Sequence, residues 1–374
     1  MIDDILLFAL PVFGLLMAAE FAWGLCRGRN TYGLADTLAS LVQGLVSQAV
    51  AACTQLVQVG VYALAWPWLA LAPHAALWHH WSGALLAVVL YDFCDYWLHR
   101  ASHESALFWA AHVVHHQSRH FNLSTALRQE SAYALTGFPF FLPMAAVGVP
   151  PAQFALAGIV VLFYQFWIHT EHVGSLGVFD RIFSTPSNHR VHHATNARYL
   201  DRNYGAILVV WDRMFGSFEP ESERCVYGTV TPLQGFGTFE AVLGPYRDLL
   251  AKCRRMRGWR DRLRAVFGAP GWEPAGSIPA PAQVPAAAVA GTMRALPAAR
   301  AALGIALFLL AVGTTGAMLW LADSLAYGRL VALAGCVLAG TWAVGAALDP
   351  RASTTLAMAA GALASLAAAI LVFA

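Results

Sequence analysis

The sequence predicts an all-α fold, an integral membrane helical bundle with a cytosolic, histidine-rich helical cap. Three observations carry this prediction. Of the 374 residues, 58% are hydrophobic and 12% are charged, against about 25% charged residues in an ordinary soluble domain. Apolar stretches near or above the roughly 18 residues that span a bilayer recur at both ends of the chain. Between these ends, residues 99–193 hold eleven of the fourteen histidines.

The first part of the chain, residues 1–81, is expected to supply N-terminal membrane helices. Residues 5–25 form an apolar stretch that leads into the basic Arg27 without a small-residue cleavage pattern. We interpret this stretch as a retained anchor with its basic end in the cytoplasm. Residues 38–72 are too long for one simple span and are interrupted by several glutamines and by Pro67. This pattern favours one span followed by an interfacial or re-entrant piece.

The next helices are expected to bring polar residues to the membrane surface. Residues 82–98 are apolar but carry Asp92 and Asp95, and they run directly into the first histidine of the polar region. Carboxylates inside an apolar helix are costly unless they have partners, so we expect a function for both. Residues 132–149 and 153–168 predict a helical hairpin that turns at a Gly-Val-Pro-Pro sequence and returns the chain to the side it left.

The last part of the chain is predicted to hold a basic segment, a linker and three more membrane helices. Residues 226–299 contain the basic cluster and, over residues 268–297, a stretch rich in Pro, Ala and Gly. Such a cluster beside a membrane is typical of a cytoplasmic segment that faces lipid headgroups. Its basic residues are Lys252, Arg254, Arg255, Arg257, Arg260, Arg262 and Arg264. The helices, within residues 300–374, are expected over residues 301–321, 330–348 and 354–374.

The histidines carry the strongest functional signal, and they define a core over residues 82–225. Eight of them fall into three tight groups at helical spacing, so that each group shares one helix face. The groups are His99 and His103; His112, His115 and His116; and His189, His192 and His193. Imidazole suits iron, copper, nickel and zinc, and eight ligands exceed what one ion of roughly four to six coordination uses. Two metal ions are therefore predicted.

Further candidates lie near these groups. His169 and His172 end the returning helix of the hairpin, and we expect His169 rather than His172 to add a metal ligand. Asp92, Asp95 and Glu104 are the candidate catalytic carboxylates and the candidate partners that fix imidazole tautomers. The remaining histidines are interpreted as interfacial or structural residues: His74, His79, His80 and His120.

The spacing HxxxH, HxxHH, HxxHH over residues 82–221 resembles the pattern of the fatty acid hydroxylase and sterol desaturase superfamily. Within it, the sequences HRASHE at residues 99–104, NLSTALR at 122–128, and NYG at 203–205 with WDR at 211–213 are most similar to one branch. That branch contains alkylglycerol monooxygenase. Where it commonly has a serine pair and a glutamate after the second histidine group, this sequence has Gln-Ser-Arg-His, which leaves the headgroup of the substrate open.

The resemblance implies a four-helix membrane scaffold capped by cytosolic helices, with two Fe ions bound by the grouped histidines. It also implies an O2-dependent hydroxylase, a monooxygenase that acts on an acyl or alkyl chain of a membrane lipid, with ether-lipid cleavage as its specific form. A lipid or sterol desaturase would use the same kind of site. A non-enzymatic metal transporter or sensor would use the histidines for zinc or copper, and the sequence leaves both alternatives open.

The source of electrons is not encoded in a recognisable motif. The sequence has no haem attachment motif, flavin fingerprint or ferredoxin-like cysteine cluster, so reductant must come from a partner or a small molecule. The resemblance suggests a pterin as the candidate. A net charge of +2 is too small to indicate nucleic-acid binding. The alanine-rich composition favours a bacterial inner membrane, with the active site on the cytoplasmic side.

Overall fold

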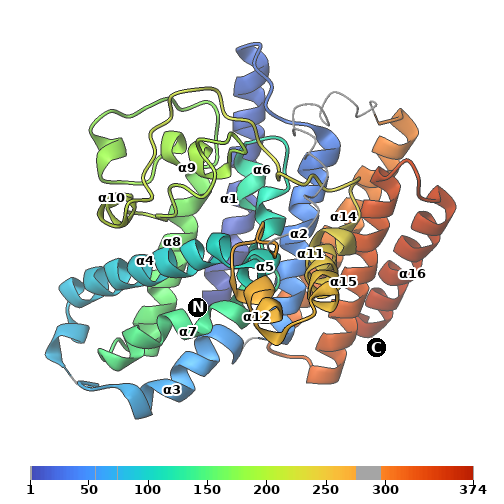
Figure 1. Ribbon diagram of the computed structural model, residues 1–374. Coiled ribbons are helices and arrows are strands. Elements are labelled where there is room, and N and C mark those ends of the chain that lie inside the picture. Colours follow the sequence, from blue (N-terminus) through green and yellow to red (C-terminus); the bar gives the residue numbers. More distant parts are fainter. Residues whose placement is uncertain (1, 55, 74, 275–295, 374) are drawn as a thin grey trace.

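The computed structural model describes residues 2–54, 56–73, 75–274 and 296–373, and within these ranges the chain forms helices and no strand (Figure 1). Five of these helical segments are long and apolar enough to cross a membrane. The predicted all-α membrane bundle is therefore confirmed. The histidine-rich segments lie together on one side of the bundle, and the last three helices stand side by side on the other.

The N-terminal helices are α1 (Ile2–Cys26) and α2 (Leu34–Cys53). A π-helical turn over Leu56–Gly60 then precedes α3 (Val61–Leu69). The long apolar stretch is thus divided into a membrane-length helix and a shorter piece, as the sequence indicates. Helix α3 packs against α7 of the hairpin, so this shorter piece supports the centre of the fold.

One buried carboxylate ties α1 to the rest of the molecule. Glu20, near the end of α1, accepts hydrogen bonds from Tyr32 Oη at 2.5 Å, the Leu123 amide at 2.8 Å and Thr170 Oγ1 at 2.5 Å. A charge in an apolar helix is stable only with such partners. Glu20 therefore joins α1 to segments that stand next to the second histidine group and to the end of the hairpin.

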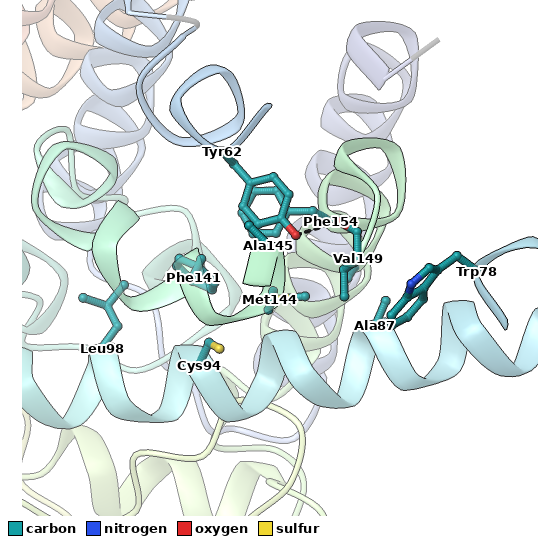
Figure 2. Close-up of a cluster of buried hydrophobic side chains, with 11 residues drawn as sticks. Tyr62, Trp78, Ala87, Cys94, Leu98, Phe141, Met144, Ala145, Val149 and Phe154 are labelled. Carbon is teal, nitrogen blue, oxygen red and sulfur yellow. Dashed lines mark hydrogen bonds between the residues drawn. The ribbon is translucent and has the colours of Figure 1, made fainter. Parts of the chain in front are cut away.

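Helix α4 (Trp81–Glu104) packs against the hairpin of α7 (Tyr133–Ala146) and α8 (Pro151–Trp167). Figure 2 shows the buried core between them, where Leu98 of α4 lies near Phe141 of α7. Burying such side chains stabilises the fold by roughly 1.5–3 kcal/mol each. This core fixes α4 in place, and the histidines at its end are fixed with it.

The hairpin is shallower than the sequence suggests. Helix α7 has 14 residues, a length of about 21 Å at 1.5 Å per residue, and it contains Pro139 and Pro143. Helix α8 has 17 residues. A full span needs about 20 residues, so α7 and α8 are not among the membrane-length helices.

Short helices build the cap. They are α5 (Ala106–His116), α6 (Leu123–Ala126), α9 (Pro186–His193) and α10 (Val210–Phe215), with a 3-10 turn at Phe179–Arg181. A second 3-10 turn, Ala76–His79, lies outside the cap and precedes α4. Helix α5 follows α4 after a single residue, Ser105, and the two helices pack together. The histidines of α4 and α5 are thereby brought close together.

Five helices complete the chain: α11 (Thr238–Arg255), α12 (Trp259–Phe267), α14 (Ala298–Leu321), α15 (Tyr327–Leu348) and α16 (Thr354–Phe373). The last three confirm the three predicted C-terminal membrane helices. Of the eight basic residues of α11, α12 and the turn between them, seven are exposed and one, Lys252, is buried.

The C-terminal helices are connected to the histidine helices through α11. Helices α14 and α15 pack on α2, in a core that contains Leu38 and Val344. At the start of α11, Thr238 Oγ1 donates to the Thr341 carbonyl of α15 at 2.8 Å, and the next turn of α11 accepts a hydrogen bond from Gln117 Nε2. Gln117 directly follows α5. Helix α11 therefore braces α5 against the C-terminal bundle.

Candidate metal centre

Nine buried histidines gather in two neighbouring groups, and they are the nine residues expected to bind metal. In each group, one nitrogen from every ring lies within 4.8 Å of those of the others. The five-histidine cluster consists of His99, His103, His112, His116 and His192. The four-histidine cluster consists of His115, His169, His189 and His193.

Helices α5 and α9 each contribute to both clusters, and this sets the clusters side by side. On α5, His112 and His116 are one turn apart and join the five-histidine cluster, whereas His115 joins the other. On α9, one histidine, His192, joins the five-histidine cluster, and the other two join the four-histidine cluster. The last turns of α4 supply His99 and His103. Histidines at i, i+3 and i+4 on one helix therefore do not all point to a single site. They are divided between two adjoining clusters.

His169 follows the end of α8 and completes the four-histidine cluster. Its Nε2 lies 3.3 Å from His115 Nε2 and 3.0 Å from His189 Nε2. His172 lies outside both clusters, with its Nε2 3.5 Å from Thr31 Oγ1. The structure therefore brings His169, and not His172, together with the other clustered histidines, and metal binding by His169 stays a prediction.

Backbone carbonyls fix the tautomers of four rings. A carbonyl oxygen only accepts hydrogen bonds, so a ring nitrogen beside it must carry the proton, and the other nitrogen then has a free lone pair. The pairs join Nδ1 to oxygen in His99 with Tyr204 (2.7 Å), His115 with Arg128 (3.0 Å), His169 with Gln165 (2.7 Å) and His192 with Arg202 (3.0 Å). In all four rings, Nε2 is left to face the cluster.

The Nε2 atoms converge in a way that neutral rings alone do not explain. His112 Nε2 lies 3.1 Å from His99 Nε2 and 3.0 Å from His116 Nε2. In the described part of the chain, the buried Nε2 atoms of His103 and His192 have no hydrogen-bond partner. Facing lone pairs repel unless a cation lies among them, so this donor set fits a metal ion.

Burial keeps the rings neutral and able to coordinate. Desolvation lowers the pKa of His112 to about 3 and that of His115 to about 4. On α9, burial likewise lowers the pKa of His189, His192 and His193 well below the usual value. A buried imidazolium is unfavourable, so at neutral pH these rings have unprotonated nitrogens for metal ions.

Glu130 is a residue of the site that the sequence analysis missed. Its carboxylate accepts a hydrogen bond from His112 Nδ1 at 2.5 Å, and the Glu130 side chain is only 10% exposed. A carboxylate in this position orients the ring and strengthens it as a ligand. Glu130 lies in the short polar stretch between the second histidine group and the hairpin, where no spacing pattern points to it.

The three carboxylates that were expected in this role have other contacts. Asp92 accepts hydrogen bonds from two backbone amides before α10, at 2.7 and 3.1 Å, and from Trp211 Nε1 at 2.8 Å. Glu104 is half exposed and pairs with Arg100 at 2.9 Å. Asp95 is buried in α4. Among the described residues, no hydrogen bond or ion pair joins any of the three to a clustered histidine. The expectation that they fix imidazole tautomers is therefore corrected.

The NYG and WDR sequences form a lock that positions His99. Asp212 accepts hydrogen bonds from the amides of Tyr204 at 2.7 Å and Gly205 at 2.8 Å. A side chain at Gly205 would meet the Leu208 carbonyl oxygen at 2.5 Å, so only glycine fits this turn. The Tyr204 carbonyl is thus held in the position where it accepts the hydrogen bond from His99 Nδ1.

The part of the chain that carries the two clusters is similar to a known protein family. Residues 84–217, which include all nine clustered histidines, match the model of the fatty acid hydroxylase family. These residues are a fatty acid hydroxylase domain. The domain extends from the start of α4 to the serine after α10, so it contains the lock formed by Asp212 as well.

Relatives of the hydroxylase domain act on lipids by name. Alkylglycerol monooxygenase of Danio rerio is 37% identical over 270 residues, which cover 71% of this chain and 59% of the relative. That of Homo sapiens is 36% identical over 273 residues, with the same coverage. Ornithine lipid hydroxylase OlsE of Rhizobium tropici is 32% identical over 218 residues, 56% of this chain and 63% of the relative. The chain spans about three fifths of the length of these relatives. No solved structure matches it.

Proposed function

We propose that this chain is an O2-dependent, membrane-bound di-iron lipid hydroxylase, a monooxygenase that acts on an acyl or alkyl chain. The observation that carries the proposal is the pair of adjoining, buried clusters with converging Nε2 atoms inside a fatty acid hydroxylase domain. Imidazole suits iron, and five and four nitrogen ligands are enough for two ions. One iron belongs to each cluster in this proposal.

Bound iron would supply the reductive activation of O2 and the removal of hydrogen from an unactivated C–H bond. The chain's own residues do the rest. The nine histidines hold the ions, and the backbone carbonyls and Glu130 hold the rings in the tautomers that coordinate. Burial of every ring keeps bulk water away from the reacting atoms.

An ether lipid is the proposed specific substrate class, and hydroxylation at the carbon beside the ether oxygen leads to cleavage. Support comes from the names of the alkylglycerol monooxygenases and the extent of their similarity. In this proposal, lipid chains reach the centre along α4, which carries two of the clustered histidines and packs against the apolar helices α7 and α8. The exposed arginines of α11 and α12 would meet lipid headgroups.

Electrons come from outside the chain, with a pterin as the proposed reductant. We further propose that the cap lies on the cytoplasmic side of a bacterial inner membrane. We also retain the division into residues 1–81, 82–225, 226–299 and 300–374 as a proposal, with the hydroxylase core in the second part.

The proposal is tested by metal content and product analysis together. The purified chain is expected to hold about two irons and to convert an alkylglycerol or an alkyl phospholipid with incorporation of oxygen from ¹⁸O2. His116→Ala removes a ligand of the five-histidine cluster and His193→Ala one of the four-histidine cluster. Each variant is expected to lose about one iron and the activity. His79→Ala, an exposed residue far from both clusters, is the matched control and keeps both irons.

Two other results would change the assignment. An unsaturated product without added oxygen would identify a desaturase that uses the same centre. Zinc or copper in both clusters, with no O2 consumed under any reductant, would contradict an oxygenase and favour a transporter or sensor.

A further inference from the structure

Tyr204, the middle residue of the NYG sequence, lies beside the five-histidine cluster and is fully buried. The centroid of its ring lies 5.4 Å from that of His103, 6.0 Å from that of His99 and 6.2 Å from that of His192. The phenol therefore stands next to three rings of one cluster. The lock that positions His99 uses only the backbone of Tyr204, so the hydroxyl of the side chain has no role in it.

The hydroxyl of Tyr204 is a buried donor without an acceptor. Its oxygen is buried and has no hydrogen-bond partner among the described residues. A phenol keeps its proton at neutral pH, so this hydroxyl has a hydrogen bond to give. An unpaired donor in a buried site is unfavourable, and buried polar groups in folded proteins nearly always have a partner. The hydroxyl therefore indicates an acceptor that binds beside the cluster.

The neighbouring rings cannot be this acceptor once the cluster holds a metal ion. In the described part of the chain, the Nε2 atoms of His103 and His192 are also buried without a hydrogen-bond partner, and a metal ion would take their lone pairs. The Nδ1 atoms of His99 and His192 are donors to backbone carbonyls. A cation accepts no hydrogen bond. A metal ion thus accounts for the ring nitrogens but not for the hydroxyl of Tyr204, whose acceptor must be a further ligand.

The number of histidines in the cluster leaves room for such a ligand. Five ring nitrogens can fill five positions of an ion that takes up to about six ligands. One position then stays open for a small molecule or an anion, as in catalytic metal sites generally. A ligand with negative charge is the better acceptor, because a hydrogen bond to a charged group is about twice as strong as one between neutral groups.

The phenol of Tyr204 is held in place before any ligand arrives. Its backbone is fixed at both ends, since the amide donates to Asp212 at 2.7 Å and the carbonyl accepts from His99 Nδ1 at 2.7 Å. Its ring lies 6.2 Å from that of Tyr96, whose own hydroxyl is 2.9 Å from Ser217 Oγ. A donor that is fixed in advance stabilises developing negative charge without the cost of reorganisation.

We propose that Tyr204 is a catalytic residue whose hydroxyl donates a hydrogen bond to the small ligand at the open position of the five-histidine cluster. The ligand is an anion or an oxygen that gains negative charge, which is the chemistry that O2 acquires when it is reduced. This inference rests on the proposed function, because it requires a metal ion in the cluster. Tyr204 keeps its proton and forms no covalent bond, so no further reactant is needed.

Azide binding to the full chain, loaded with Co²⁺ in detergent, tests the role of the hydroxyl without catalysis. Azide is a small anion, and the visible absorption of Co²⁺ changes with its ligands, so a titration gives the Kd. We expect Tyr204→Phe to raise this Kd about tenfold or more, since it removes a hydrogen bond to a charged ligand. Cobalt content and the spectrum before azide is added should equal those of the parent, because the ring and the backbone contacts remain. Tyr96→Phe is the matched control. It removes a buried hydroxyl that already has partners in Ser217 and Arg100, and the Kd should not change.

His193→Ala assigns the effect to one cluster. This substitution removes a ligand of the four-histidine cluster and leaves the five-histidine cluster intact, so Tyr204→Phe should weaken azide binding by the same factor in that background. An unchanged Kd in Tyr204→Phe, an equal loss in Tyr96→Phe, or an effect that disappears with His193→Ala would overturn the proposal. So would a parent chain that binds no azide, or a Tyr204→Phe chain whose spectrum has changed before azide is added. The expected azide effect in a chain that forms no hydroxylated lipid would refute the hydroxylase function and leave the ligand contact of Tyr204 standing.

Discussion

The carboxylate of Glu130 holds the ring of His112, and through it one wall of the five-histidine cluster. We expect Glu130→Ala to lower the affinity for iron about 10- to 100-fold, the range found when the carboxylate behind a metal-bound histidine is removed. Glu130→Gln should lose less, because an amide oxygen still accepts a hydrogen bond from Nδ1. Competition with a chelator, followed by iron content, measures the effect.

Glu104→Ala is the control for this substitution. Glu104 directly follows His103 in sequence, yet its side chain is half exposed and pairs with Arg100. Iron affinity should therefore stay at the level of the parent. Equal losses in the Glu130 and Glu104 variants would contradict the role assigned to Glu130.

Sequence spacing predicted which histidines cluster, but not which residues fix the orientation of their rings. Residues three or four apart on a helix share a face, so His112, His115 and His116 could be grouped without a structure. The partners of these rings lie 13 to 18 residues away in Glu130 and Arg128, and 105 residues away for the His99 contact with Tyr204. Such contacts depend on how the helices pack, which no local pattern describes.

At the scale of elements, the contact between α11 and α15 depends on a glycine. A Cβ at Gly345 would lie 2.8 Å from the Phe236 carbonyl oxygen and 2.7 Å from Thr238 Oγ1. We expect Gly345→Ala to push α11 away from α15 and to destabilise the protein by about 1–3 kcal/mol, as overpacking does elsewhere. Thermal unfolding in detergent measures the change.

Gly335 provides a control within the same helix. A Cβ at Gly335 would meet nothing within 4 Å, so Gly335→Ala should leave the unfolding temperature unchanged or raise it slightly, because alanine is the better helix former. A loss of stability in the Gly335 variant as large as in the Gly345 variant would show that close packing at α11 is not the cause.

The long helices were predictable and the short ones were not. Apolar length alone located α1, α14, α15 and α16, because a span must satisfy its backbone within one helix. Helix α6 has four residues and depends on a capping box between Asn122 and Thr125. Its existence follows from tertiary contacts, such as the Asn122 side-chain bond to the Thr31 carbonyl, rather than from hydrophobic periodicity.

At the scale of the whole molecule, the sequence predicted which histidines come together but left the C-terminal helices without a purpose. Composition placed the histidines between apolar ends, and the number of candidate ligands predicts two ions. The structure adds that α14 and α15 pack on α2, that α16 packs on α14 and α15, and that α15 contacts α11, which in turn contacts α5. Long-range packing of this kind is carried by small residues with no charge or motif, so it cannot be seen in one sequence.

This packing predicts that the C-terminal helices bind the rest of the chain without a covalent link. When residues 1–274 and 296–374 are produced together as separate pieces, the second should co-purify with a tag on the first, because α15 and α14 fill a continuous core with α2. Ala347→Trp, at a fully buried position of that core, should abolish co-purification by overpacking. Leu356→Trp, on the exposed face of α16, should not. Pieces that fail to associate, beside a first piece that keeps its metal and its stability, would contradict a supporting role for residues 300–374.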